Sequence, residues 1–302
     1  MTVSRVQMAS GGPSVSRFAA GFWRLRAWGF SQQELLSFIE QNLELGVTTM
    51  DHAVVYNSEA LFGDALALKP SLREQMEIVT KSGIVPAGAA DFGAPKTSHY
   101  DSRKASIVRS VNASLSRLRT DYIDLLLIHR PDFLMHAEDV AEAFAELRAQ
   151  GKVRHFGVSN FNVHQFDYLQ QALGDEQLVT NQIELSPYNM QALDQGALEQ
   201  CGRERISPML WSCLAGGHLM TPTDDKGRRV AAALEKVGQE IGAQALEQVV
   251  YAWVLAMPYN PVPLLGTSKI ERIKLAVAAE KFPLTHEQWY SIWEAANGRP
   301  VP

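Results

Sequence analysis

The side chains able to do chemistry fall at the ends of short apolar segments of this sequence. Polar or aromatic residues end these strand-like runs, namely Asp51, Lys81, His129, Asn160, Gln182, Trp211 and Ser212. Charged groups in a mostly enclosed place are costly unless they are paired, so we predict that Asp51 and Lys81, on adjacent strands, form an ion pair. Tyr56 follows Asp51 by five residues and is expected on the next loop or its first turn.

Together, a tyrosine, a lysine, an aspartate and a histidine can reduce a carbonyl group. A tyrosine with an ordinary pKa of about 10 is too weak an acid near neutral pH to protonate a forming alkoxide well. We predict that the lysine ammonium lowers this pKa and that the aspartate keeps the lysine charged and oriented. A histidine can hydrogen-bond to the carbonyl oxygen and set its angle. Such a site suits hydride transfer from a nicotinamide, and one donor aimed at the developing charge contributes about 3 kcal/mol.

Short apolar or β-branched runs alternate with segments of helical period along most of the chain. Strands are predicted at residues 15–19, 48–52, 77–82, 124–129, 153–158, 179–183, 208–212 and 262–265. Helices are predicted at residues 31–45, 102–118, 137–149, 163–173, 195–203, 243–256 and 269–279. Ser31 and Glu34 have the spacing of a capping box, and Asn162 can cap the helix that follows it. Gly46 and Gly151 lie just past helical runs, where a residue in the left-handed conformation commonly ends a helix.

Eight strands, each followed by a helix, favour an α/β fold in which a parallel sheet closes into a (β/α)8 TIM barrel. The C-terminal ends of barrel strands converge on one face, where such enzymes carry out their chemistry. The competing fold, an open doubly wound sheet, would bind a dinucleotide through GxGxxG after its first strand, and residues 14–22 lack that spacing. Loops at residues 83–97 and 216–228 follow strands, so both are expected to overhang the same face.

The composition narrows the class of protein. The 302 residues, 46% of them hydrophobic, are ample for one barrel domain spanning residues 1–302. The net charge of −5, with scattered lysines and arginines, argues against nucleic acid as a partner. Cys201 and Cys213 have no CxxC spacing and no histidines have a metal-ligand spacing, so we predict neither a disulfide nor a metal. No signal-peptide run and no long apolar stretch is present, so we expect a cytoplasmic protein without a membrane segment.

Five segments, in order, resemble motifs of the aldo/keto reductase family. They are DHAVVY at residues 51–56, VTKSG at 79–83, DYIDLLLIHRPD at 121–132, GVSNF at 157–161 and NQIE at 181–184. The segment at 121–132 is the most specific of them, and the resemblance covers nearly the whole chain. It implies an NADP(H)-dependent oxidoreductase that reduces aldehydes or ketones to alcohols.

The resemblance implies a role for each catalytic residue. Tyr56 would be the general acid that protonates the substrate oxygen. Lys81 and Asp51 would tune its pKa, and His129 would orient the carbonyl group. The apolar walls of the pocket for a small carbonyl substrate are expected at Phe22, Trp23, Val55, Phe92 and Tyr100. The resemblance also favours a monomer.

By the same resemblance, a second group of residues would hold the nicotinamide and the pyrophosphate. Trp211 stands where the family usually has a tyrosine stacked on the nicotinamide ring, and an indole can serve the same purpose. The carboxamide would be held by Ser159, Asn160 and Gln182. The pyrophosphate would pass Ser212, Leu214 and Gly216, since glycine permits close approach of a ligand to the backbone.

The segment LGTSKIER at residues 265–272 resembles the part of the family that binds the adenosine phosphate. Contacts there would come from Gly266, Thr267, Ser268, Lys269 and Arg272. Arg272 can grip a 2′-phosphate bidentately, so NADPH is the expected cofactor and NADH the less favoured alternative. Two departures from the family leave the strength of the preference for NADPH over NADH open. Gly266 stands where many members carry a lysine, and Ala276 stands where many carry an amide side chain.

Other functions remain open on the sequence. A barrel of this family could serve mainly as an interaction or redox-sensing subunit, as the potassium-channel β subunits suggest. Lys81 could instead be a Schiff-base nucleophile, as in aldolases, although a paired Asp51 that keeps the lysine charged argues against this. In a purely structural interpretation, Asp51 and Lys81 form only an ion pair that stabilises the barrel, and Trp211 packs at its rim.

Overall fold

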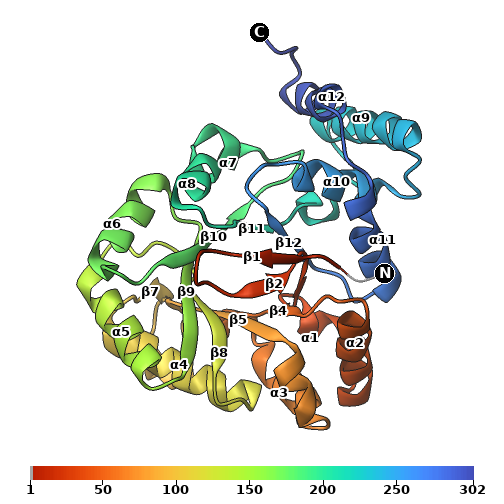
Figure 1. Ribbon diagram of the computed structural model, residues 1–302. Helices are drawn as coiled ribbons and strands as arrows, with labels where there is room; N and C mark the ends of the chain where they lie inside the picture. The colour runs from red at the N-terminus through yellow and green to blue at the C-terminus, as the bar shows by residue number, and fades with distance from the viewer. Residues whose placement is uncertain (1–2) are drawn as a thin grey trace.

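The computed structural model describes residues 3–302 and forms a closed barrel of eight parallel strands surrounded by helices (Figure 1). The strands follow one another around the ring as β3 (Ala19–Gly21), β4 (Thr49–Asp51), β5 (Glu77–Ser82), β8 (Ile123–Ile128), β9 (Val153–Ser159), β10 (Leu178–Glu184), β11 (Met209–Trp211) and β12 (Val262–Leu265). The predicted TIM-barrel fold is therefore confirmed. All eight strands run parallel, so their C-terminal ends lie on one face.

A ring of helices covers the outside of the barrel (Figure 1). Its members are α2 (Gln32–Glu44), α3 (Glu59–Leu66), α4 (Lys104–Leu118), α5 (Ala137–Ala149), α6 (Val163–Leu173), α8 (Ala197–Glu204), α10 (Leu246–Leu255) and α11 (Ile270–Ala278). The predicted helix ends are confirmed at α2 and α6, where Ser31 and Asn162 each complete a capping box. Gly46 and Gly151 have φ of 82° and 68°, the left-handed conformation predicted for them.

The first predicted strand was placed wrongly. Residues 14–16 form β2 (Ser14–Ser16), which pairs antiparallel with β1 (Arg5–Gln7), and the first barrel strand begins only at Ala19. Figure 1 shows this hairpin lying across the barrel, with β2 beside β4. A short apolar run predicts an extended segment, but it does not say which sheet the segment joins.

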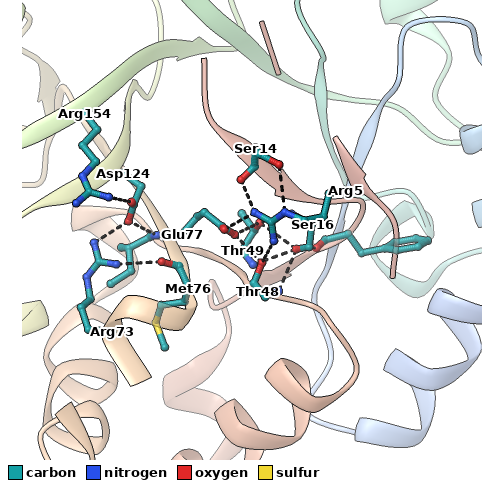
Figure 2. A network of polar contacts seen from close by, with 12 residues as sticks. Arg5, Ser14, Ser16, Thr48, Thr49, Arg73, Met76, Glu77, Asp124 and Arg154 are labelled. Atoms are coloured by element: carbon teal, nitrogen blue, oxygen red, sulfur yellow. Dashed lines mark hydrogen bonds and ion pairs between the residues drawn. The ribbon is translucent and has the colours of Figure 1, made fainter. Parts of the chain in front are cut away.

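Polar contacts attach the hairpin to the N-terminal ends of the barrel strands (Figure 2). Arg5 pairs with Glu77 at 2.5 Å and donates to Ser14 and Thr48. In the same view, Asp124 pairs with Arg73 at 2.6 Å and with Arg154 at 3.3 Å. The charges on this side of the barrel are thus matched within the protein, as expected of the face that supports stability rather than chemistry.

The second predicted loop, residues 216–228, was also partly wrong. Its last residues belong to α9 (Asp225–Ile241), a helix that the sequence analysis did not predict. Asp224 caps this helix by accepting a hydrogen bond from the Gly227 backbone, and Val230 and Leu234 lie on its buried face. Figure 1 shows α9 packed beside α12 (His286–Asn297), outside the ring and near the C-terminus. The two helices pack against each other, and most of the exposed side chains of α9 are charged or polar.

Short elements complete the described chain. They are α1 (Leu25–Trp28), α7 (Gln191–Asp194) and the two-stranded sheet of β6 (Ile84–Val85) and β7 (His99–Tyr100). The sheet of β6 and β7 lies in and beside the predicted loop at residues 83–97, whose 3₁₀ turn at Ala90–Phe92 packs on α4. Within residues 3–302, no helix combines the length and the apolar character needed to cross a membrane.

Candidate active site

A cavity opens at the C-terminal ends of the barrel strands. The predicted strand-end residues that line it are Asp51, His129, Asn160, Gln182, Trp211 and Ser212, and Ser159 lines it as well. Parallel pairing explains their convergence, because Asp51 lies opposite Val79 on β5 and Gln182 lies opposite both Ser159 on β9 and Met209 on β11. Six of the predicted strand-end positions therefore share one cavity, and the side chain of Lys81 is sealed behind it with no exposed surface.

Lys81 is completely enclosed and bonded on several sides. Its Nζ lies 2.7 Å and 2.9 Å from the two carboxylate oxygens of Asp51, and it donates to the backbone carbonyl of His52 at 2.7 Å. The amide of Gln182 donates to the same carboxylate at 2.8 Å. The predicted ion pair is present, and its hydrogen bonds offset the cost of taking two charges out of water.

Tyr56 lies beside this pair. Tyr56 is the last residue of a single 3₁₀ turn, Val54–Tyr56, that follows β4. Asn57 ends this turn in the left-handed conformation, with φ of 53°. The ring centre is 5.0 Å from Lys81 Nζ and 5.6 Å from the ring centre of His129, with the two rings nearly perpendicular. The structure thus brings together the four side chains that the sequence analysis put forward as catalytic.

The pKa of Tyr56 differs from the sequence prediction. Burial raises the pKa of the phenol above its ordinary value and Asp51 adds to this, whereas Lys81 and Arg130 lower it by less. Lys81 therefore lowers the pKa of Tyr56, as predicted, but the net shift of that pKa is upward. The sequence argument considered the ammonium alone, and the removal of the phenol from water outweighs it.

Lys81 and His129 have well-defined charge states. Burial lowers the pKa of Lys81, but the charges of Asp51 and Tyr56 raise it by more, so the ammonium form is retained. Burial lowers the pKa of His129 to about 2, and the nearby Lys81 and Arg130 act in the same direction. The imidazole of His129 is therefore neutral near pH 7, and one of its nitrogens carries a hydrogen that can be donated.

A chain of hydrogen bonds holds the cavity wall next to His129. The Trp211 indole donates to the side-chain oxygen of Asn160 at 3.1 Å. The amide nitrogen of Asn160 donates to Ser159 Oγ at 2.7 Å and to the His129 carbonyl at 3.3 Å. Ser159 in turn donates to the backbone oxygen of Gln182 at 2.8 Å. These contacts orient the Trp211 indole and the Asn160 amide.

The other end of the cavity is formed by backbone and by one ion pair. Residues lining it include Ser212, Leu214, Gly216, Gly217, Gly266, Thr267 and Arg272. Arg272 pairs with Glu247 of α10, with its Nη2 2.8 Å and its Nε 3.0 Å from one carboxylate oxygen. Ser268 and Lys269, predicted as phosphate ligands, are not among the residues that line the cavity, and they directly precede α11.

Comparison with known proteins identifies the family of this chain. Residues 17–297 match the aldo/keto reductase family. The chain belongs to this family. It is 48% identical to the oxidoreductase YdhF of Escherichia coli over 99% of this chain and all of that protein. It is 40% identical to a 6-dehydroglucose reductase of Agrobacterium fabrum over 95% of this chain and 96% of that one. A thermostable aldo-keto reductase crystallised with the inhibitor epalrestat superimposes with a TM-score of 0.80, at 25% identity, over 97% of this chain and all of that one.

Within this aldo/keto reductase, the predicted substrate walls are only partly on the cavity. Trp23 and Val55 line it. Phe22 is instead buried in the core, where it stacks on His52 at 4.7 Å. Phe92 lies outside the cavity, close to Arg109 of α4 at 5.8 Å, and Tyr100 is an exposed residue of β7. The prediction was wrong for these three residues because they were assigned to loops. The direction of a loop side chain depends on tertiary packing, which a local sequence pattern does not reveal.

Three charged residues of the cavity were missed by the sequence analysis. Arg130 and Arg24 line it, as does Glu247. A signal for Arg130 existed, because it directly follows the strand-end residue His129. No such signal existed for Glu247, whose place on the cavity depends on how α10 packs against α11.

Proposed function

We propose that this aldo/keto reductase uses NADPH to reduce the carbonyl group of small aldehydes or ketones, with Tyr56 as the proton donor. The observation that supports this most is the cluster of Tyr56 with Lys81 and His129 at one cavity. A phenol next to a buried ammonium and a neutral imidazole is a combination suited to protonating an oxygen that gains charge. Membership of an oxidoreductase family is consistent with this chemistry.

The cavity has the features that a nicotinamide dinucleotide needs. The Trp211 indole is held by Asn160 at the end nearest His129, where it can stack on the nicotinamide ring. At Gly216, Gly217 and Gly266 an added Cβ would meet no atom within 4 Å, so this backbone is open to phosphate groups. Arg272 supplies a guanidinium for the 2′-phosphate. When bound there, NADPH supplies the hydrogen and the two electrons that form the new C–H bond of the product.

The protein's own residues handle the oxygen of the substrate. His129 donates an N–H hydrogen bond to the carbonyl oxygen, which fixes the carbonyl angle. Tyr56 gives its phenolic proton to the same oxygen as the C=O π bond opens, and an alcohol results. Because its pKa is raised by burial, Tyr56 keeps this proton until the oxygen becomes basic. Lys81 then stabilises the phenolate that remains, and Asp51 keeps Lys81 charged.

The Schiff-base alternative is not supported by the surroundings of Lys81. A nucleophilic lysine needs a neutral amine with access to the substrate. Lys81 has no exposed side-chain surface, makes three hydrogen bonds, and has a pKa above its ordinary value because of Asp51 and Tyr56 in spite of burial. Its position favours an electrostatic role.

The test is NADPH oxidation by the purified protein with a panel of aldehydes and ketones. We expect carbonyl-dependent oxidation, and we expect Tyr56→Phe to lower kcat by about 10²- to 10⁴-fold, the usual contribution of a general acid. Fluorescence titration should show that the variant still binds NADPH. Turnover that survives in Tyr56→Phe would mean that another group is the acid. NADPH binding without oxidation by any carbonyl would favour the subunit-like alternative.

A further inference from the structure

Arg130 is a cation of the cavity whose side chain has no hydrogen-bond or ion-pair partner among the described residues, 3–302. It directly follows His129 and is half-buried, with its guanidinium carbon 5.9 Å from the centre of the Trp211 ring. The nearest acid in sequence, Asp132, accepts from the backbone N–H groups of Ser102 and Leu134, both at 2.9 Å. A half-buried guanidinium on the cavity wall with no counter-charge among the described residues is available to pair with an anion that enters the cavity.

The remaining charges of the cavity do not supply that anion. Its two acidic residues are already paired, Asp51 with Lys81 and Glu247 with Arg272. The other unpaired cation, Arg24, is exposed and lies over the Trp23 ring at 5.0 Å, where water screens its charge. The described part of the cavity therefore carries an excess of positive charge, and Arg130 is its least solvated source.

Arg130 lies at the substrate end of the cavity rather than at the phosphate end. Its neighbours are His129 and Trp211, whereas the cofactor phosphates in the proposed function meet residues 212–217 and Arg272. Its charge also reaches the reacting groups. The pKa of His129 is lowered by burial, then by Lys81 and by Arg130. An anion at Arg130 is thus near the carbonyl and away from the phosphates of the dinucleotide.

We propose that Arg130 binds an anionic oxo group of the substrate, so that the preferred substrates are carbonyl compounds that carry a carboxylate or a phosphate. This inference rests on the proposed function. A planar guanidinium offers parallel N–H groups that match two oxygens of such an anion. Its position beside His129 holds the carbonyl of the same molecule against Tyr56.

The experiment compares substrates that differ in charge at one place. The carboxylate pairs are 4-oxobutanoate with its methyl ester and 4-formylbenzoate with its methyl ester, and the phosphate pair is glyceraldehyde 3-phosphate with glyceraldehyde. With saturating NADPH, kcat/KM should be about 10- to 100-fold higher for the charged member of at least one pair, as for a charge-assisted hydrogen bond. The preferred pair identifies the anion as carboxylate or phosphate.

Variants show whether the preference comes from Arg130. In Arg130→Met the ratio of charged to neutral kcat/KM should fall to about one, and Arg130→Lys should keep part of it, because an ammonium retains the charge without the planar fork. The matched control is Arg26→Met, which removes an exposed cation of α1 that does not line the cavity and should leave the ratio unchanged.

The results separate this inference from the proposed function. Equal kcat/KM for the charged and neutral members of all three pairs, with neutral carbonyls still reduced, overturns the anion site and leaves the reductase intact. A loss of NADPH affinity in Arg130→Met as large as its loss of kcat/KM also overturns it, since Arg130 would then bind the cofactor. If no carbonyl of any kind is reduced, the proposed function fails, and the inference fails with it.

Discussion

The two ends of the cavity are built in different ways. At the catalytic end, Lys81 and Asp51 lie on barrel strands, have at most 2% of their side chains exposed, and share bonds with His52 and Gln182. At the end where we propose that the cofactor phosphates bind, Arg272 lies on an outer helix, has 39% of its side chain exposed, and pairs with Glu247. The first end is enclosed by the barrel, whereas the second is held by one accessible ion pair.

This difference indicates which end of the cavity tolerates substitutions without loss of catalytic activity. Breaking a buried, hydrogen-bonded ion pair by removing one partner costs about 3–5 kcal/mol, whereas an exposed pair contributes about 0–1 kcal/mol. The catalytic end is therefore strongly constrained and arranged before a ligand arrives. In the proposed function, Arg272 exchanges Glu247 for a phosphate at little cost, so we expect cofactor preference to be adjustable at this end.

The largest effect is expected for turnover in Lys81→Met. Without the ammonium, the Tyr56 phenolate loses the cation that stabilises it most, and we expect kcat to fall by about 10²- to 10⁴-fold with NADPH affinity largely kept. Steady-state kinetics and a fluorescence titration of NADPH measure the two quantities. A variant that keeps normal kcat would show that Lys81 is only structural, and the contrast between the two ends would then lose its functional meaning.

The next effect is on the free energy of unfolding, and it tests whether Lys81 also stabilises the fold by pairing with the buried Asp51. Lys81→Met leaves Asp51 as an uncompensated buried charge, so denaturant unfolding should show a loss of about 3–5 kcal/mol. The double variant Lys81→Met, Asp51→Asn removes both charges and should recover part of that loss while remaining inactive. If the double variant is as unstable as the single one, uncompensated charge is not the cause.

At the phosphate end, Arg272→Ala should weaken NADPH binding by about 10- to 100-fold through the loss of a charge-assisted bidentate contact. NADH lacks the 2′-phosphate, so its Kd should change much less. Parallel titrations of wild type and variant with both nucleotides measure the difference. Equal losses for NADPH and NADH would remove the phosphate role assigned to Arg272.

The smallest effect is expected for Glu247→Gln. Glu247 now neutralises Arg272 at 2.8 Å, and a 2′-phosphate must compete with it. Removing the carboxylate charge should tighten NADPH binding by roughly 2- to 5-fold, the range of a partly exposed ion pair, and should leave kcat unchanged. Weaker NADPH binding in this variant would show instead that Glu247 orients Arg272 for the phosphate.

Much of the framework was predictable because it depends on local signals. Capping residues such as Ser31 and Asn162 act within one turn, so the starts of α2 and α6 follow from a few neighbouring residues. Polar residues at the ends of apolar runs predicted the convergence of Asp51, His129 and Gln182, because parallel strands in a closed barrel end on one face. The sequence did not separate the N-terminal hairpin from the barrel, since both are short extended runs.

By itself, the sequence determined the alternation of strands and helices, the order of the motifs and the chemical types at the strand ends. Only the tertiary structure decided the raised pKa of Tyr56, the pairing of Arg272 with Glu247 and the position of Arg130 beside Trp211. These depend on the exclusion of water and on neighbours from distant parts of the chain. Desolvation and long-range pairing arise only once the barrel has closed.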